Sequence, residues 1–183
     1  MKQSLQPIAE PFPADVADIL AKYPQGQDGC ILQLFRVFAN SKRFLTDKGP
    51  SNLLDKGSPL SLRQREIIIL RVTANNQCEY EWGVHVSVFA KAARLTPAQI
   101  AATCAAEGTG PFWDEDENLL IQCIDQLCQQ SKIQDAIYEK FQEHWTLEQQ
   151  LEILALCGNY HLVSLVANTS RLSLEPASAS FSN

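Results

Sequence analysis

Three residues with the chemistry of an active site stand at helical spacing near the middle of the chain. Cys78 precedes Glu81 by three residues, and Glu81 precedes His85 by four. On an α-helix these intervals place the three side chains on one face, close enough to interact. A thiol, a carboxyl and an imidazole can supply a nucleophile, a proton carrier and a base. We therefore take Cys78, Glu81 and His85 as candidate catalytic residues.

Glu66 joins this group if two successive helices form a hairpin. It lies at the start of the preceding predicted helix, and a hairpin would fold it back against His85. A proton path would then run from Glu66 through His85 to Cys78 or to a bound substrate. Because Cys78 follows a break and lies near a helix start, backbone N–H groups and the helix dipole are expected to favour its thiolate.

The same pattern also has a purely structural interpretation. A cysteine near a helix start can be a small buried hydrophobe, and a Glu–His pair four residues apart can be a surface ion pair. Apolar neighbours of the pair, including Trp82, indicate that the polar face is partly buried. Tyr160 and His161 interrupt an apolar stretch later in the chain and are either pocket residues or a hydrogen-bonded packing pair. We expect Trp82, Tyr160 and His161 to contribute to substrate binding.

The elements that must position these residues are all predicted to be helices. Ile67–Ile69 is β-branched and would suit a strand, but its charged flanks favour a helix, and no convincing strand pair or hairpin turn occurs. Ser61 and Thr96 are candidate N-caps, and Pro97 suits a first helical position. The helical periodicity covers residues 15–23, 30–38, 53–54, 62–73, 78–93, 97–105, 114–131, 133–141 and 147–172. The expected fold class is all-α, with residues 1–13 as an extended arm, 14–176 as a single domain and 177–183 as a tail.

Composition narrows the classes of partner. The chain has 183 residues, 45% hydrophobic and 20% charged, with a net charge of −6. This composition is that of a globular domain, and no basic run is available to bind nucleic acid. The apolar stretches are shorter than a membrane span requires, so we expect a cytoplasmic protein without a membrane partner. The six cysteines lack a Cys-x-x-Cys pair and the three histidines are scattered, so neither a metal nor an organic cofactor is expected.

The chain resembles the carboxymuconolactone decarboxylase family, which includes the alkylhydroperoxidase D proteins. Residues 60–66 (LSLRQRE) and 78–85 (CEYEWGVH) carry the resemblance, with weaker similarity at 34–39, 112–113, 159–163 and 175–176. It extends over about residues 7 to 176. The resemblance implies an all-helical fold in which a helix hairpin carries the active site. It also implies a homo-oligomer, commonly a trimer or hexamer, with sites near subunit boundaries.

The sequence identifies the family more firmly than it identifies the reaction. The hydroperoxidase branch has a glutamate, a Cys-x-x-Cys pair and a histidine; Glu66, Cys78 and His85 match, but Glu81 replaces the second cysteine. An active-site disulfide within the motif is therefore excluded, and a dithiol cycle would need a distant thiol such as Cys30 or Cys157.

The decarboxylase branch uses acid–base chemistry, which Glu81 and His85 could supply without a redox partner. Such an enzyme should also present cations to substrate carboxylates, and the candidates near the motif are Arg63, Arg65 and Arg71.

Three hypotheses follow for a small-molecule substrate. The first is a decarboxylase-like enzyme acting on a small organic acid or lactone, with His85 as base, Glu81 as acid or orienting group and Glu66 behind them. The second is a one-cysteine thiol peroxidase in which Cys78 attacks a peroxide and an external thiol reduces the sulfenic acid. The third is a non-catalytic helical oligomer that binds a ligand in the same pocket. The first is preferred because Glu81 removes the most obvious redox partner.

Overall fold

The computed structural model describes residues 6–26, 29–41, 45 and 57–181, and the fold within these ranges is all-helical. The helices are α1 (Ala14–Leu20), α2 (Gln33–Phe38), α3 (Leu62–Asn75), α4 (Glu79–Phe89), α5 (Pro97–Thr103), α6 (Glu115–Gln130), α7 (Asp135–His144) and α8 (Leu147–Thr169). The only β-type pairing among the described residues is an isolated bridge between Gln25 and Ile31. The expected all-α class is confirmed. The short helix expected at 53–54 lies outside the described residues.

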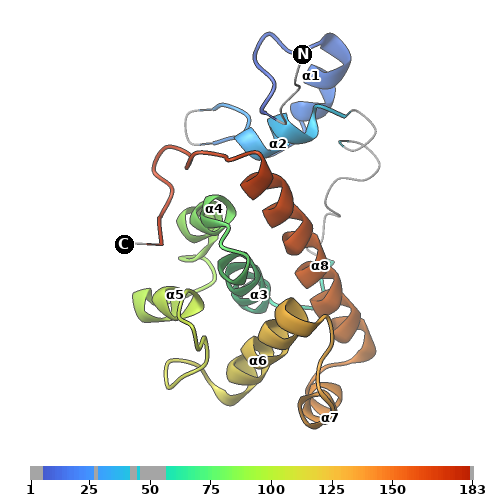
Figure 1. The fold of residues 1–183 in the computed structure, drawn as a ribbon, viewed down its shortest axis with the longest axis vertical. Coiled ribbons are helices and arrows are strands. Elements are labelled where there is room, and N and C mark those ends of the chain that lie inside the picture. The colour runs from blue at the N-terminus through green and yellow to red at the C-terminus, as the bar shows by residue number, and fades with distance from the viewer. Residues whose placement is uncertain (1–5, 27–28, 42–44, 46–56, 182–183) are drawn as a thin grey trace.

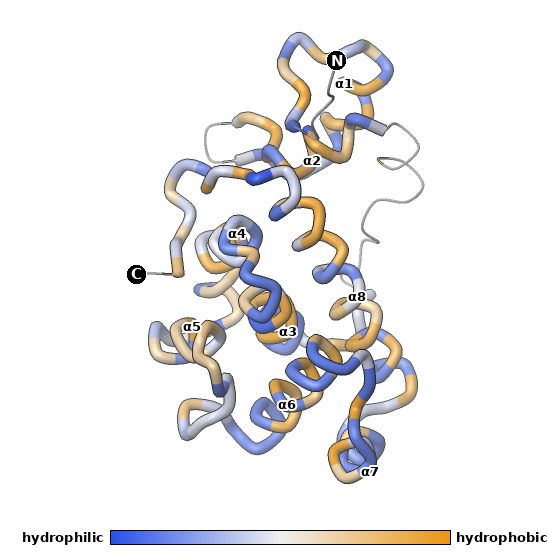
Figure 2. The backbone as a smooth tube through the Cα atoms, in the orientation of Figure 1, coloured by the Kyte–Doolittle hydropathy of each residue, from blue (hydrophilic) through white to orange (hydrophobic). Residues whose placement is uncertain are grey.

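Helix α3 lies at the centre of the molecule, between α4, α5, α6 and α8 (Figure 1). Its residues from Arg65 to Thr73 are all buried, and Ile67 to Leu70 have no exposed surface. A helix that is buried all round belongs in a core, and here tertiary packing outweighs the strand propensity of the isoleucine run. Figure 2 shows hydrophobic residues along this central helix. Glu66 on α3 is therefore held in a fully buried part of the fold.

The expected caps Ser61 and Thr96 are present, and Asp114 and Thr146 cap two further helices. Ser61, Thr96, Asp114 and Thr146 each accept a hydrogen bond from the backbone N–H three residues later, and each forms a complete capping box with a Gln or Glu side chain. Such a box satisfies two backbone N–H groups that would otherwise lack partners. The starts of α3, α5, α6 and α8 are thus encoded locally.

Other helix boundaries differ from the expected ones. Helix α2 begins at Gln33 rather than Cys30, because the Gly26 N–H donates to the Cys30 carbonyl and Ile31 forms the bridge to Gln25. Helix α4 begins after Cys78, which is its N-cap, and ends at Phe89. Helix α8 ends at Thr169, just before Arg171 adopts a positive φ of 51°. Contrary to the expectation that no stretch would, α8 meets the length and composition of a membrane-spanning helix, but 44% of its most apolar window is buried inside the protein, and core helices pass the same test.

Both ends of the described chain are held against helices of the domain by hydrogen bonds. Ile8 exchanges hydrogen bonds with Arg36, which ties the N-terminal arm to α2. After α8, the chain runs back over α4: Ser87 donates to the Ala177 carbonyl and accepts from the Ala179 N–H. We call residues 173–181 the C-terminal strap; it passes beside α4 in Figure 1.

Candidate active site

A tight turn joins α3 to α4 and makes the expected hairpin. Gln77 adopts a left-handed conformation with φ of 52°. The Gln77 N–H donates to the Ala74 carbonyl, and the Cys78 N–H donates to the Thr73 carbonyl. This is the hydrogen-bond pattern of a Schellman motif, which ends a helix and reverses the chain. The two helices consequently pack against each other, with Glu66 facing α4 and His85 facing α3.

His85 is the centre of a buried polar cluster. Its Nδ1 lies 2.9 Å from Glu66 Oε2, and its Nε2 lies 3.1 Å from the Tyr160 hydroxyl and 3.5 Å from Glu81 Oε1. All four residues are buried, and Glu66 and His85 almost completely so. The hairpin thus brings together three of the predicted catalytic residues, and α8 adds Tyr160.

The two carboxylates keep a proton on His85. Burial lowers the pKa of His85, but Glu66 and Glu81 outweigh this effect by charge and by hydrogen bonding, and together raise the pKa to about 10. Desolvation, together with the negative charges of Glu81 and Glu66, also raises the pKa of Tyr160 well above its usual value. At neutral pH the cluster contains an imidazolium, a neutral phenol and the acidic groups that face them.

The Cys78 thiol lies in the hydrophobic core and not among the polar groups around His85. Its side chain has no exposed surface and belongs to the hydrophobic core. Burial raises the pKa of the thiol, and the charge of Glu81 raises it further, whereas hydrogen bonds to the Glu81 backbone and to Ser164 lower it. The expectation that the helix start would favour the thiolate is therefore wrong, because desolvation outweighs the helix terminus.

A cavity of about 890 Å³ lies over the cluster. Glu81, His85 and Tyr160 line it, together with apolar side chains of the α2 region and α4. Lys22 and the C-terminal strap complete its wall. The cavity residues drawn from the strap and from the α1–α2 region are Lys22, Tyr23, Pro24, Gln25, Gly26, Leu32, Leu34, Phe35, Glu175, Pro176, Ala177 and Ser178.

Two residues expected to bind substrate lie outside this cavity. The Trp82 indole is buried on another side of α4, where its Nε1 donates to Thr103 Oγ1 at 2.9 Å and its ring contacts Phe181. His161 is exposed on α8, because one residue along a helix turns the side chain by about 100° from that of Tyr160. Of the three expected substrate-binding residues, the structure places Tyr160 alone at the cavity.

The three arginines near the motif do not line the cavity either. Arg63 pairs with Glu117, and Arg71 pairs with Asp125 while also donating to backbone carbonyls after α5. Arg65 is buried on α3. Among the described residues, Lys22 is the one cationic side chain other than His85 in the cavity wall. No described group of three His, Cys, Asp or Glu residues is placed to hold a metal ion.

Sequence reasoning did not identify the hydrogen-bonded contact that closes the cavity wall. The Tyr80 hydroxyl donates to Glu175 Oε1 at 2.5 Å, and the same oxygen accepts the Gln33 N–H at the start of α2. Glu175 thus connects α2, α4 and the strap. Its partners are 95 and 142 positions away in sequence, and no local pattern connects residues so far apart.

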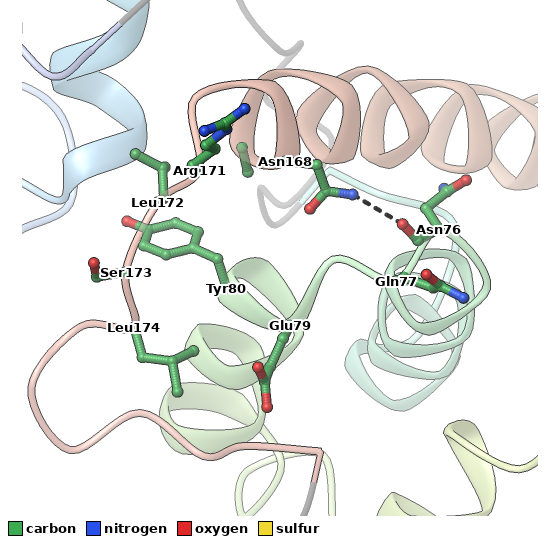
Figure 3. Close-up of a pocket in the computed structure, with 10 residues that line it drawn as sticks. Asn76, Gln77, Glu79, Tyr80, Asn168, Arg171, Leu172, Ser173 and Leu174 are labelled. Atoms are coloured by element: carbon green, nitrogen blue, oxygen red, sulfur yellow. Dashed lines mark hydrogen bonds between the residues drawn. The ribbon is translucent and has the colours of Figure 1, made fainter.

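A second cavity, of about 570 Å³, lies between the α3–α4 turn, the end of α8 and the first part of the strap (Figure 3). Tyr80 and Glu79 point toward it from α4, and Asn168 donates to the Asn76 carbonyl at its edge. None of the predicted catalytic residues lines it. The chemistry is therefore concentrated at the larger cavity.

Comparison with known structures places the chain in a class of all-helical proteins that resemble alkylhydroperoxidase D. An uncharacterized peroxidase-related protein from Silicibacter sp. TM1040 is 18% identical with a TM-score of 0.75, covering 93% of this chain and 92% of its own. A protein from Ralstonia eutropha JMP134, described as an alkylhydroperoxidase AhpD core and peroxidase-related, is 20% identical with a TM-score of 0.67, covering 92% and 91%. A putative antioxidant defence protein AhpD from Agrobacterium tumefaciens is 20% identical with a TM-score of 0.59, covering 64% and 81%.

The central segment of the sequence matches a known family. Residues 51–120 match the carboxymuconolactone decarboxylase family, so the resemblance expected from the hairpin motif is confirmed over this segment. Glu66, Cys78, Glu81 and His85 all lie within it. No curated protein matches the chain.

Proposed function

We propose that this protein is an enzyme that moves protons on a small, uncharged, oxygenated molecule, such as a lactone or an unsaturated ketone. The family and the fold support an enzyme of decarboxylase or alkylhydroperoxidase type. The single observation that favours proton transfer is that Glu81, His85 and Tyr160 line the cavity while Cys78 does not.

The raised pKa of His85 changes the roles expected from the sequence. Because His85 carries a proton at neutral pH, it is a donor rather than a free base. Glu81 is the carboxylate that both touches His85 and lines the cavity. We assign Glu81 as the base and His85 as the acid, with Glu66 fixing the His85 ring from behind.

A double-bond shift fits this arrangement. Glu81 would remove a proton from a carbon beside the substrate carbonyl, and the electron pair of that C–H bond would delocalise onto the carbonyl oxygen. A hydrogen bond from His85 or Tyr160 would stabilise the resulting enolate. Return of the proton from Glu81 to another carbon would complete the isomerisation without an oxidant or a reductant.

The cavity wall favours a neutral substrate. Substrate carboxylates are usually bound by arginine, and Arg63, Arg65 and Arg71 are all placed elsewhere. The wall is instead largely apolar, with Leu34, Phe35 and Val163 among its residues. A lactone thus suits the cavity better than the small organic acid that the sequence also allowed.

The test is hydrogen–deuterium exchange into a panel of lactones and cyclic enones in D₂O, followed by NMR. We expect the wild type and Cys78→Ser to catalyse exchange. Glu81→Gln and His85→Gln should each reduce the rate by at least about 100-fold, since a positioned general acid or base contributes roughly 10²–10⁴. Loss of exchange in Cys78→Ser with full activity in Glu81→Gln would contradict the proposal.

The thiol peroxidase remains the alternative, because the Silicibacter and Ralstonia structures are described as peroxidase-related. Stoichiometric peroxide with a sulfenic-acid trap and mass spectrometry separates the two functions. A fully buried thiol with a raised pKa should stay unmodified over minutes. Rapid trapping at Cys78 would instead support the peroxidase.

A further inference from the structure

The second cavity has the size of a ligand site but none of the groups assigned to the reaction. Its volume of about 570 Å³ lies within the range of small-molecule pockets, roughly 300–1,000 Å³. The polar cluster around His85 contributes no residue to its wall. The wall comes instead from the α3–α4 turn, the end of α8 and the first part of the strap (Figure 3).

Arg171 is the one cationic side chain in the described wall of this cavity, and its guanidinium has no partner among the described residues. The Arg171 N–H donates to the Asn168 carbonyl, and the Leu172 N–H donates to the Ala167 carbonyl. Arg171 therefore occupies the left-handed position of a Schellman motif, where glycine is the usual residue because it has no Cβ. The end of α8 gives no reason for an arginine here, whereas an anion in the cavity would give one.

Glu79 supplies the opposite charge to the same cavity. One of its carboxylate oxygens accepts the Phe181 N–H, and the other has no partner among the described residues. Figure 3 shows Arg171 and Glu79 on opposite sides of the cavity, with the Tyr80 ring between them in this view. A cation and a carboxylate that share a cavity without pairing can bind a ligand that carries both charges.

The surface between the two charges combines amide and apolar groups. Asn168 uses one N–H to reach the Asn76 carbonyl, so its other N–H and its side-chain oxygen can bind a ligand. The Gln77 amide is exposed beside it. Leu174, which is 38% exposed, and the Tyr80 ring add apolar contact. This combination suits a peptide bond and a side chain held between charged ends.

We propose that the second cavity binds a short zwitterion with the chemistry of a dipeptide. Arg171 binds its carboxylate, Glu79 binds its ammonium group, and Asn168 contacts its amide. A simple anion fits less well, because Glu79 and the net charge of −6 would repel it. A simple cation would be repelled by Arg171. This site does not depend on the reaction at the larger cavity.

The strap connects this site to the larger cavity. Residues 172–174 line the second cavity and residues 175–178 line the larger one. Arg171 precedes the strap, and Glu79 holds Phe181, its last residue. A ligand that joins Arg171 to Glu79 therefore restrains the strap at both ends. It should slow local opening of the wall that the strap gives to the larger cavity.

The first test is an NMR titration of the full chain with alanyl-leucine, N-acetyl-alanyl-leucine and alanyl-leucine amide. We expect the free dipeptide to shift the amide signals of Gln77, Asn168 and Ser173. Each blocked form lacks one charge and should bind at least about tenfold more weakly, because a hydrogen bond between charged groups is lost. Equal affinity for the three compounds, or no shift at about 20 mM dipeptide, would overturn the proposal.

Two variants assign each charge to its residue. Arg171→Gln should bind the free dipeptide at least about tenfold more weakly and should no longer distinguish it from the C-terminal amide. Glu79→Gln should no longer distinguish the free dipeptide from the N-acetyl form. Arg94→Gln is the matched control, since Arg94 is also exposed with a positive φ of 56° but lines neither cavity. A loss of affinity in Arg94→Gln equal to that in Arg171→Gln would reduce the effect to net charge and overturn the site.

Amide exchange followed by mass spectrometry measures the connection to the strap. Saturating alanyl-leucine should slow exchange at residues 173–181 several-fold in the wild type and in Arg94→Gln. The same concentration should leave exchange in Arg171→Gln unchanged, and circular dichroism should show that every variant is folded. Unchanged exchange in the wild-type strap with the dipeptide bound would overturn the coupling between the two cavities.

Discussion

His85 combines near-complete burial with a proton that it holds at neutral pH. An isolated imidazolium that is only 3% exposed would lose its proton, because burial penalises the charged form. Glu66 at 2.9 Å and Glu81 at 3.5 Å supply the compensating charge. The remaining ring contact is the Tyr160 hydroxyl, whose raised pKa keeps it neutral. The site is therefore already charged before any substrate arrives.

This proton makes folding stability depend on pH in a defined direction. The pKa of His85 is about 10 when folded and roughly 6.5 when unfolded, so the folded state binds more protons between these values. The stabilisation is complete below about pH 6.5 and is lost as the pH rises toward 10. We expect the free energy of unfolding to fall by up to about 1.4 kcal/mol per pH unit in this window.

Urea unfolding at pH 6.5 to 9.5 measures the effect, with His85→Gln as the comparison. The variant removes the titrating group and should show a flatter profile over the same range. Parallel slopes for the two proteins would mean that His85 is neutral in the folded state, and the assignment of His85 as the acid would then fail.

The site residues on the hairpin could be predicted because they lie close to one another along the sequence. Helical spacing of three and four residues links Cys78, Glu81 and His85, and one tight turn brings Glu66 to them. Tyr160 was identified as one of two equivalent neighbours, but the sequence could not say whether it or His161 faces inward. The pKa of Cys78 was mispredicted because burial is a property of the packed molecule, whereas a helix start is local.

At the scale of elements, Gly83 lets the C-terminal strap lie directly against α4. A Cβ built at Gly83 would collide with the Ala179 carbonyl oxygen. Beside it, Ser87 makes two hydrogen bonds to the strap, and the Phe181 N–H donates to Glu79. The strap can thus lie against α4 at Ala179 because this helical position lacks a side chain.

Gly83→Ala should therefore detach the strap while leaving the helices folded. Alanine improves helix propensity by about 1 kcal/mol, which offsets part of the lost contact. We expect little change in the melting temperature but a several-fold increase in amide exchange and proteolysis at residues 176–181. Gly158→Ala is the control, because it makes the same change in open space. Equal protection of the strap in both variants would show that Gly83 is not required for its docking.

The periodicity of the sequence predicted the helices, and the caps Ser61 and Thr96 predicted two of the helix starts. The strap was not predicted, because residues 173–181 have no periodicity and are placed by contacts with α2 and α4. The end of α8 was placed three residues too late for a related reason. The apolar pattern continues through Leu172, but the backbone turns at Arg171.

At the scale of the whole molecule, two arginines on α3 each form an ion pair with a carboxylate of α6. Arg63 pairs with Glu117 and Arg71 with Asp125, each 54 positions further along the chain. Both arginines also donate to backbone carbonyls, Arg71 to Thr103 and Ala105 and Arg63 to Ala93 and Arg94. They differ in burial: Arg71 is almost fully buried, whereas the Arg63 side chain is 29% exposed. The buried arginine thus connects α3, α6 and the end of α5.

Arg71→Gln should destabilise the protein far more than Arg63→Gln. Removing one partner of a buried pair costs about 3–5 kcal/mol, and several carbonyls would also lose their donor. A partly exposed pair contributes about 1 kcal/mol or less. Urea denaturation of the two variants tests this directly, and equal midpoints would show that burial does not distinguish the two pairs.

The residues that line the cavity come from separate segments of the chain. Glu81 and His85 lie within residues 51–120, the segment that matches the family, whereas Tyr23, Phe35 and Glu175 lie outside it. Tyr160, which contacts His85, also lies outside that segment. Chimaeras that exchange the two ends between relatives, and keep the hairpin and Tyr160, would therefore change the surface around the proposed reaction centre and so the molecules that are accepted.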